Sequence, residues 1–442
     1  MTTQTPQPVA LPEIQENTLY GKGDTLVLFG ELFGRGYVSG LLDAAKAAGM
    51  TIVGITVGRR DENNDLRALT EEELAQAEEF LGGKIVNVPL MAGFDLDAPE
   101  GGKNPTDMVN EMTIDSWQEH KLDMDHIEAC REIGVTRFTT ALKEAMAQLD
   151  ALIPADGNVL FTHTMAGGIP RAKVFMAIAN RIYKGRGARY QPSQSLVDSD
   201  LGKLILKNFD EVTANTFGHL IEASSAIRAR VEGAGGQVRY VAYGYHGTEV
   251  LIDGEYAWQT YTNYTQGYAK MNLENIAKDA WEKGIKATVF NCPEIRTNSS
   301  DVFAGIELSL VPLLAAFRKE GGGAWAEEQW VKCQELLNDD VTLESVLQQV
   351  NDYQTDPIMQ SFTNFPAWPM PNTAEQVEKT VGTSQEIMQL HKNRKVLVSD
   401  LLSQHVVSAT GELIFGEVSD PSGPTLWLNH DMVARRLIKS NG

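Results

Sequence analysis

Apolar residues in the first part of the chain alternate between short continuous runs and longer segments with helical spacing. The run TLVLF at residues 25–29 is bounded by glycine, which is the pattern of a buried strand. The following segment, YVSGLLDAAKAAG, has apolar residues at helical spacing and ends at Gly49, a favoured residue beyond a helix C-terminus. A tight strand-to-helix turn is therefore predicted between them.

The same alternation continues along the chain. We predict further strands in TIVGITV, KIVNVPL, NVLFTH, QVRYVAYG and KATVFN. The predicted helices cover residues 69–80, 136–153, 205–231 and 267–282. Strands that alternate with helices are typical of a parallel sheet with crossover helices, so we predict an α/β doubly wound parallel sheet of the Rossmann-like kind.

Two polar stretches interrupt this pattern, and we interpret them as insertions near residues 92–133 and 170–201. Beyond Phe303 the patterns are helical until GELIFGE at 411–417, which we predict to be a strand that returns to the sheet. The expected organisation has four parts: a flexible leader (1–22), a core with both insertions (23–304), a helical extension (305–405), and a return strand with a C-terminal tail (406–442).

The net charge and the N-terminal sequence indicate which binding partners and which cellular compartment to expect. The net charge of −21 argues against a general nucleic-acid or membrane-surface partner, because both require a positive face. The segment YKGRGARY at 183–190 is the best candidate for a local basic patch, with a solvated loop as the alternative. No apolar run reaches the roughly 20 residues of a membrane span, and the N-terminus lacks signal-peptide features. We therefore expect a cytoplasmic protein.

Neither the cysteines nor the histidines form a ligand pattern. The three cysteines are widely spaced, so we expect them to be reduced and structural. The spacing of His163, His219 and His246 matches no metal site, and no metal is predicted.

The glycine-rich turn after the first strand is a candidate phosphate-binding loop. Gly30, Gly34 and Gly36 lack a Cβ atom, which lets the backbone approach a ligand, and the first turn of the next helix offers N–H groups to an anion. Their spacing differs from the common G-x-G-x-x-G fingerprint, so an ordinary glycine-rich turn is the alternative. The candidate cofactor-binding residues of this turn are Gly30, Leu32, Phe33, Gly34, Arg35 and Gly36.

Two arginines follow the second predicted strand, at the position that lies beside the adenosine ribose in a doubly wound nucleotide-binding sheet. An acidic residue there would bind the ribose 2′-hydroxyl, whereas Arg59, with Arg60 behind it, suits a 2′-phosphate. Gly58 would let the chain turn. Because no carboxylate is expected at this position, we predict that the cofactor is NADPH, with NADH as the alternative. The alternative interpretation of the two arginines is that they are simply exposed to solvent.

Several segments together resemble the short-chain dehydrogenase/reductase superfamily. The spacing of the three glycines is that superfamily's own phosphate turn, and NVLFTHTMAGG is similar to its fourth strand and following turn, although His163 and Thr164 replace the usual asparagines. The segment FDEVTANTFGHLIEAS resembles its long central helix, which implies a structural, proton-relay role for Asn215. The resemblance spans most of residues 25–300.

The segment AKMNLENIAKDAWEKGIKATVFNCPEIRTNSS resembles the superfamily's catalytic-lysine helix, sixth strand and nicotinamide-side loop. The resemblance implies that Lys270 is the catalytic lysine and also holds the cofactor ribose. It places Ile295 and Thr297 in the loop beside the nicotinamide. Glu294 stands where a glycine is usual.

The catalytic tyrosine of the family's ketoreductases lies four residues before the lysine, and here that position is Gln266. Tyr261 gives a Tyr-x8-Lys spacing, which resembles the enoyl-thioester reductases with long spacing, extra helices and a chain of about this length. A displaced phenol is needed for alkene reduction, because the developing enolate oxygen lies further from the nicotinamide than a ketone oxygen. In a continuous helix Tyr264 and Tyr268 would lie about 120° and 160° from the lysine.

The resemblance implies NADPH-dependent reduction of a trans-2-enoyl thioester, carried by acyl carrier protein or coenzyme A. Tyr261 would stabilise or protonate the enolate, and Tyr243 or Tyr245 at the end of the fifth strand would assist, with ordinary aromatic packing as their alternative. The helical extension would cover the acyl site. Two alternatives remain open: an NADP-dependent carbonyl or 3-ketoacyl reductase that uses Tyr264, and a non-catalytic NADP-binding sensor.

Overall fold

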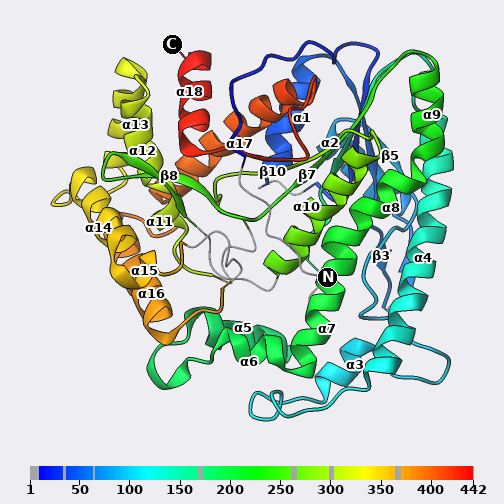
Figure 1. The fold of residues 1–442 in the computed structure, drawn as a ribbon, viewed down its shortest axis with the longest axis horizontal. Helices are drawn as coiled ribbons and strands as arrows, with labels where there is room; N and C mark the ends of the chain where they lie inside the picture. The colour runs from blue at the N-terminus through cyan, green and yellow to red at the C-terminus, as the bar shows by residue number, and fades with distance from the viewer. Residues whose placement is uncertain are drawn as a thin grey trace.

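A parallel sheet forms the centre of the protein, with helices on both faces (Figure 1). The computed structural model describes residues 9–32, 36–62, 65–167, 173–259, 266–297, 303–363 and 370–441. Within these ranges the sheet has seven strands: β1 (Thr25–Phe29), β2 (Thr51–Ile55), β5 (Lys84–Val86), β6 (Val159–His163), β7 (Val238–Tyr243), β10 (Ala287–Asn291) and β11 (Thr425–Trp427).

The strand order is β11-β10-β7-β6-β1-β2-β5, and every neighbouring pair is parallel. The chain starts in the middle, moves to one edge, and returns to build the other half, which is the order of the dinucleotide-binding fold. The predicted doubly wound α/β fold is confirmed. In register, Phe29 lies beside both Ile55 and His163. The loops that follow these three strands therefore leave the same edge of the sheet.

Alternation along β1 explains the two helical layers. Leu26 and Leu28 belong to a core that includes α1 (Tyr37–Ala47) and α17 (Val398–Glu417). Val27 and Phe29 belong to a second core on the other face. That face is covered by α4 (Met124–Asp150), α8 (Thr216–Ala223) and α10 (Gln266–Glu282). The sheet is thus buried on both faces, which accounts for its continuous apolar strands.

The predicted return strand at 411–417 is wrong, because these residues form the last turns of α17. The strand that joins the sheet is β11, which pairs with β10. The helix α17 is buried on several sides, by α1, α11 (Ile306–Leu310) and α18 (His430–Asn441). A helix that is apolar all round shows no helical period, and its sequence is easily mistaken for a strand.

Both predicted insertions are more helical than expected. The first contains α3 (Pro105–Asn110) and the start of α4, which begins at Met124 rather than near residue 136. The second contains α5 (Lys173–Lys184), a short 3-10 turn η1 (Gly187–Arg189) and α6 (Ser193–Asp198). The two insertions share a third core, which includes Phe94, Trp117 and Phe175. They stabilise each other by this mutual burial.

The helix predicted at 205–231 is divided into four parts. The first part, α7 (Asp200–Phe209), begins earlier than predicted because Ser199 caps it. A π-helical turn, η2 (Asp210–Asn215), follows it, and α8 and α9 (Ser225–Gly233) are the last two parts.

A β-hairpin that was not predicted from the sequence joins β8 (Thr248–Ile252) to β9 (Glu255–Gln259). Its turn, Asp253–Gly254, has two positive φ angles, 47° and 87°, as two-residue hairpin turns require.

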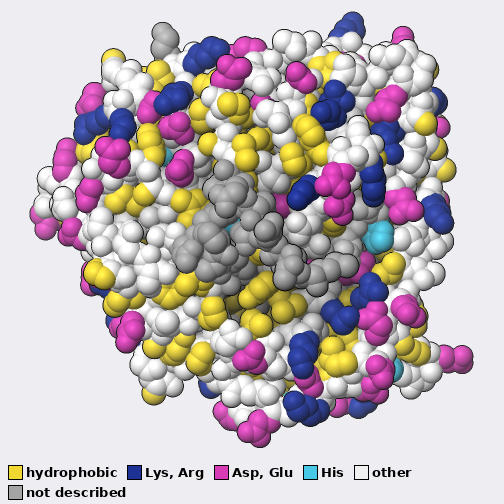
Figure 2. All heavy atoms as spheres, viewed as in Figure 1, with side chains coloured by type: hydrophobic (Ala, Val, Ile, Leu, Met, Phe, Trp, Pro, Cys, Tyr) yellow, Lys and Arg dark blue, Asp and Glu magenta, His cyan; other side chains and the backbone are white. Residues whose placement is uncertain are grey.

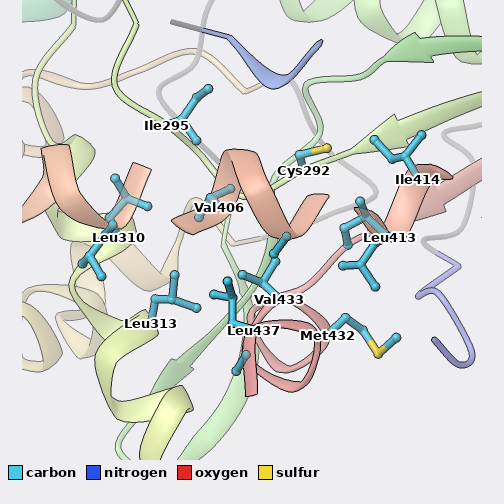
Figure 3. Close-up of a cluster of buried hydrophobic side chains, with 14 of the residues drawn as sticks. Cys292, Ile295, Leu310, Leu313, Val406, Leu413, Ile414, Met432, Val433 and Leu437 are labelled. Atoms are coloured by element: carbon cyan, nitrogen blue, oxygen red, sulfur yellow. The ribbon is translucent and has the colours of Figure 1, made fainter. Parts of the chain in front are cut away.

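The helices after residue 305 share the main core with the sheet. They are α11, α12 (Pro312–Lys319), α13 (Gly323–Gln334), α14 (Leu343–Thr355), α15 (Pro357–Gln360), α16 (Ala374–Gln389), α17 and α18. Figure 3 shows side chains from the β10 loop, α12, α17 and α18 converging in one cluster, with Ile295, Leu313, Val406 and Val433 among them. The extension therefore has no core of its own.

Part of the predicted flexible leader is fixed to the protein. Leu11 and Tyr20 are buried, and the backbone N–H of Leu11 donates to the Trp427 carbonyl oxygen at 2.9 Å.

The remaining helix is α2 (Glu71–Leu81). Two short strands, β3 (Arg59–Arg60) and β4 (Leu66–Arg67), pair in a small antiparallel ribbon. Acidic and basic side chains are interspersed over the face drawn in Figure 2. No helix in the described ranges is long and apolar enough to cross a membrane.

Candidate functional site

The loops at the carboxyl ends of β1 and β6 approach each other closely. Gly30 has φ +128°, and a Cβ atom there would lie 2.3 Å from Oγ1 of Thr164. The hydroxyl of Thr164 in turn donates to the Phe29 carbonyl oxygen at 3.3 Å. This glycine is therefore required by the contact between two loops as well as by its positive φ.

The helix α1 begins directly beyond this turn. Gly36 precedes it in an extended conformation, and no atom lies within 4 Å of the position of a Cβ there. Phe33, Gly34 and Arg35 lie outside the described residues. The first residue of the helix, Tyr37, stacks on Tyr243 with ring centroids 5.7 Å apart, and its hydroxyl donates to the Pro293 carbonyl oxygen at 2.8 Å. These contacts fix the N-terminus of α1 beside the ends of β7 and β10.

A pocket of about 310 Å³ lies at the ends of β1 and β2 and is lined by Gly30, Glu31, Leu32, Arg59 and other residues. Nη2 of Arg59 lies 2.6 Å from Oε1 of Glu31. The expectation that no carboxylate stands at this position is therefore wrong. The sequence analysis missed Glu31 because it follows β1, whereas the ribose-binding carboxylate is usually sought after β2.

The chain turns between β2 and the arginines as predicted, since Gly58 has φ +86°. Arg60 follows Arg59 in β3 and is half-buried. The candidate cofactor residues thus divide between two pockets. A second pocket, of about 920 Å³, lies between α1 and α17 and is lined by Gly36 and Ile295. Thr297 is half-buried in the loop that follows Ile295.

Lys270 lies on α10 with its side chain buried at the end of β7. Its Nζ atom donates to the Tyr243 carbonyl oxygen at 2.6 Å. Burial lowers the pKa of the ammonium to about 8, while the nearby carboxylate of Glu274, one helical turn away, acts to raise that pKa. A buried cation whose pKa is near physiological pH, at the carboxyl edge of a doubly wound sheet, is a strong candidate for a functional group.

A buried polar network that sequence analysis missed surrounds Glu274. Nδ1 of His246 lies 3.1 Å from its Oε2, and Nδ2 of Asn291 donates to its Oε1 at 2.8 Å. The backbone N–H of His246 donates to Oδ1 of Asn291 at 2.8 Å, which closes the network. All three side chains are at most 2% exposed. The spacing of four residues between Lys270 and Glu274 was the available signal in the sequence.

The two tyrosines predicted near the end of β7 differ in their surroundings. Tyr243 is the last residue of the strand and is buried, and burial raises the pKa of its phenol well above 10. Its hydroxyl has no hydrogen-bond partner within the described part of the chain. Tyr245 lies two residues further along and is half-buried.

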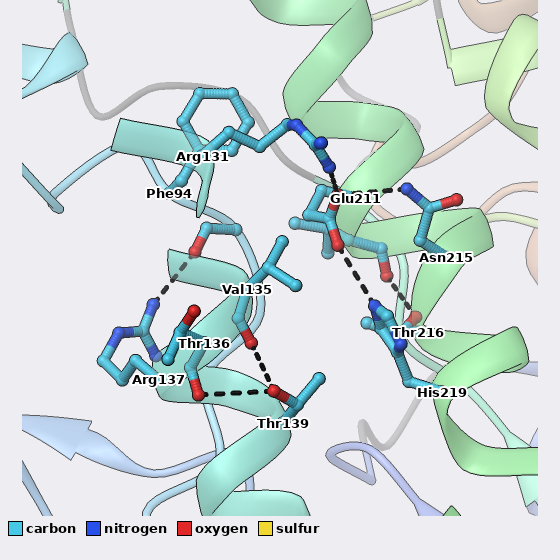
Figure 4. Close-up of polar contacts among 12 residues, drawn as sticks. Phe94, Arg131, Val135, Thr136, Arg137, Thr139, Glu211, Asn215, Thr216 and His219 are labelled. Carbon is cyan, nitrogen blue, oxygen red and sulfur yellow. Dashed lines mark hydrogen bonds and ion pairs between the residues drawn. The ribbon is translucent and has the colours of Figure 1, made fainter. Parts of the chain in front are cut away.

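Asn215 ends the π-helical turn η2, which packs against α10. Its Nδ2 atom donates to Oε2 of Glu211 at 3.0 Å, and Glu211 also binds Arg131 and His219 (Figure 4). Irregular π-turns are frequent at functional sites, and this one packs against the helix that carries Lys270.

The two candidate proton donors, Tyr261 and Tyr264, lie outside the described residues. The helix α10 begins at Gln266, so both precede it. Tyr268 lies within the helix, is half-buried, and has its pKa raised by burial.

Glu294 occupies the position at which the resemblance led us to expect glycine. It lines a small cavity of about 50 Å³ together with Gln259, Ser309 and Tyr353. Burial raises the pKa of its carboxyl to about 7, against the opposing effect of a hydrogen bond with Ser309. The cavity lies between the β10 loop and the helical extension, which sequence analysis could not predict because its lining residues come from distant segments.

No group of three or more potential metal ligands occurs in the ranges that the structure describes. His163 is buried, and its Nε2 atom lies 2.8 Å from Oγ1 of Thr216. Burial lowers the pKa of His163 to about 3, so the ring is neutral at physiological pH. The three cysteines are buried, and none is in a disulfide in this structure.

A family model and two solved structures that resemble this chain point to the same kind of enzyme. A family model described as "Enoyl-acyl carrier protein reductase FabMG" matches residues 7–437. An apo structure of FabMG, described as a novel type of enoyl-acyl carrier protein reductase, has 63% sequence identity and a TM-score of 0.96, over 98% of each chain. An NADH-bound FabMG structure has 54% identity and a TM-score of 0.80, over 98% of this chain and 100% of that chain. Among curated proteins, none matches. The chain belongs to the FabMG family of enoyl-acyl carrier protein reductases and is an oxidoreductase.

Proposed function

We propose that this protein reduces the alkene of a trans-2-enoyl thioester, using the carboxyl edge of its sheet as the active site. The observation that carries the proposal is the buried ammonium of Lys270, held 2.6 Å from the Tyr243 carbonyl oxygen at the end of β7. In this fold, ligands bind in the crevice at the carboxyl ends of the strands. A cation there lowers the pKa of a nearby phenol, which can then stabilise or protonate the developing enolate oxygen.

The residues at this edge fit a nicotinamide dinucleotide. The N-terminus of α1 opens beside a Gly36 that has free space around it, which suits a pyrophosphate. The pocket with Arg59 and Glu31 suits the adenosine ribose. When bound, the cofactor supplies the hydride that adds to Cβ of the alkene.

In this proposal Tyr261 stabilises the enolate oxygen or donates the proton, and Lys270 lowers the pKa of that phenol and holds the ribose hydroxyls. Tyr243 or Tyr245 assists at the oxygen, and Asn215 supports the proton relay. The Tyr-x8-Lys spacing and membership of the short-chain superfamily are part of the proposal. The strand order, with the first strand central, supports that membership.

We propose NADPH as the cofactor, since Arg59 and Arg60 stand where a 2′-phosphate would lie. A specific observation favours NADH as the second candidate. The Glu31 carboxylate lies 2.6 Å from Arg59, so it neutralises that cation and offers an acceptor for a 2′-hydroxyl. The relative with 54% identity is described as NADH-bound.

The test is oxidation of NADPH and of NADH in the presence of crotonyl thioester or acetoacetyl thioester. We expect oxidation with the crotonyl substrate alone, and recovery of the saturated butyryl thioester. Oxidation with acetoacetyl thioester alone would favour the carbonyl-reductase alternative. Cofactor binding without turnover on either substrate would favour the sensor.

A further inference from the structure

The basic segment YKGRGARY contributes to a groove that adjoins the small cavity lined by Glu294. This groove, of about 370 Å³, lies between α5–η1 on one side and α11 and α16 on the other. We call it the basic groove, because Lys184, Arg186, Arg189 and Arg296 all line it. Its remaining walls include apolar side chains such as Val381 and Met388. These four cations gather along one groove in a chain whose net charge is −21.

The cations of the basic groove differ in how far they are neutralised. Arg186 forms an ion pair with Glu378, and Nη1 of Arg296 lies 3.0 Å from Asp400. Arg189 is exposed, and no ion pair joins it to any residue that the structure describes. Among the described lining residues, Glu307 contributes a carboxyl group, and burial raises its pKa, which favours its neutral form. The groove therefore retains positive charge.

The basic groove adjoins the small cavity that contains Glu294. Both are lined by Ala304 and Gly305. The aromatic pair Tyr183 and Phe303, with ring centroids 5.0 Å apart, stands between them, since Tyr183 lines the cavity and Phe303 lines the groove. An elongated ligand could thus have its charged end in the groove and its apolar end toward the interior.

We propose that the basic groove binds the phosphate of the pantetheine arm that carries the acyl thioester, with Arg189 as its principal contact. This inference rests on the proposed function. Both sources of such a thioester, coenzyme A and acyl carrier protein, carry a phosphate at the end of this arm. A guanidinium pairs with phosphate through two parallel hydrogen bonds, which suits Arg189 because no residue that the structure describes forms an ion pair with it.

The test compares Arg189→Gln with wild type on matched crotonyl thioesters. The N-acetylcysteamine thioester lacks the phosphate, and the 4′-phosphopantetheine thioester has it. We expect KM for the phosphorylated substrate to rise by about tenfold, the scale of one exposed charge-assisted contact, with KM for the other unchanged. Arg189→Lys should recover part of the loss. The control is Lys143→Gln, which removes one exposed positive charge from α4, a helix that contributes no residue to the lining of the groove.

Two further substrates, the coenzyme A and carrier-protein thioesters, distinguish the sources. An increase in KM for both supports recognition of the shared phosphate. An increase for the carrier-protein substrate alone overturns the proposal in favour of a protein-docking surface, and equal changes with and without phosphate overturn it as well. Failure of the proposed function is recognised separately, because wild type would then reduce none of these thioesters.

Discussion

At the scale of single residues, two neighbours, Tyr243 and Glu274, determine the properties of Lys270. The Tyr243 carbonyl oxygen fixes the ammonium at the end of β7, and the carboxylate of Glu274 offsets part of the cost of burying it. Glu274 is itself held by His246 and Asn291. The charge of the lysine therefore depends on a buried polar network at the ends of β7 and β10.

The first prediction concerns the proton donor. Tyr261→Phe and Lys270→Ala should each reduce kcat by a factor on the order of 10² or more, the scale of a positioned acid or electrostatic stabiliser. Tyr268→Phe should leave kcat nearly unchanged and serves as the matched control. Steady-state kinetics with crotonyl thioester measures all three. If Tyr264→Phe is inactive while Tyr261→Phe is close to wild type, the Tyr-x8-Lys assignment fails.

The second prediction concerns pH. The ammonium of Lys270, with its pKa near 8, is charged below that pH, so kcat should fall as pH rises through about 8. Glu274→Gln removes the charge that raises this pKa, and the fall should therefore move to lower pH. The control is Glu282→Gln, an exposed carboxylate on the same helix. Identical pH profiles for both variants would contradict the role of Glu274.

The same pKa predicts the sign of a stability change. The pKa of Lys270 is about 8 in the folded protein and is ordinarily 10.5, so the unfolded chain binds more protons between these values. The contribution of this residue to the free energy of unfolding should increase with pH across that window. Denaturant titrations of wild type and Lys270→Met at several pH values would measure it.

The third prediction concerns cofactor choice. We expect wild type to prefer NADPH, and Arg59→Asp to raise KM for NADPH by about tenfold or more, because it removes the partner of the 2′-phosphate. Glu31→Gln should raise KM for NADH and leave NADPH use intact. Equal use of the two cofactors by wild type, or a preference for NADH, would overturn the NADPH assignment and favour Glu31 as the ribose-binding residue.

At the scale of elements, the crossing of α1 and α17 joins the sheet to the C-terminal helices. The two helices meet at Gly40 and Gly411, where their backbones are in contact. A Cβ at Gly40 would lie 1.9 Å from the Val407 carbonyl oxygen, and a Cβ at Gly411 would lie 2.1 Å from the Gly40 carbonyl carbon. Neither neighbour is a flexible side chain, so the helices would have to separate.

We therefore predict that Gly411→Ala lowers the free energy of unfolding by about 3 kcal/mol or more, as severe overpacking does. The matched control is Gly218→Ala in α8, where the nearest atom to the new methyl lies 3.8 Å away. That change should be neutral or slightly stabilising, because alanine is the better helix former. Thermal and chemical denaturation measure both variants, and equal midpoints would show that α1 and α17 can separate at little cost.

At the scale of the whole molecule, one core extends from the sheet into the helices after residue 305. Strand residues Leu26 and Phe290 share it with Leu313 and Leu413. We predict that a fragment ending near residue 304 does not fold, because it would expose this face of the sheet and lack β11. Limited proteolysis of the full chain, followed by assay of the products, provides the test. A stable, fully active fragment ending near residue 305 would contradict this prediction.

The sequence alone determined the elements whose signal is local. The strand TLVLF, the turn at Gly30, the helix ending before Gly49 and the order of strands and helices each depend on a periodicity or a glycine within a few residues. Arg59 was identified for the same reason, since it follows the end of a strand. Lys270 was identified by the resemblance of its segment to the catalytic-lysine helix of a known superfamily.

Only the tertiary structure decided features that depend on residues distant in sequence. The assignment of 411–417 to α17 depends on burial by other helices. The edge strand of the sheet is β11, whose three residues are too few to show a strand pattern in the sequence. The Glu31–Arg59 pair, the Glu274 network and the basic groove each join separate segments of the chain. Their distances are set by how the helices pack on the sheet, which no local pattern encodes.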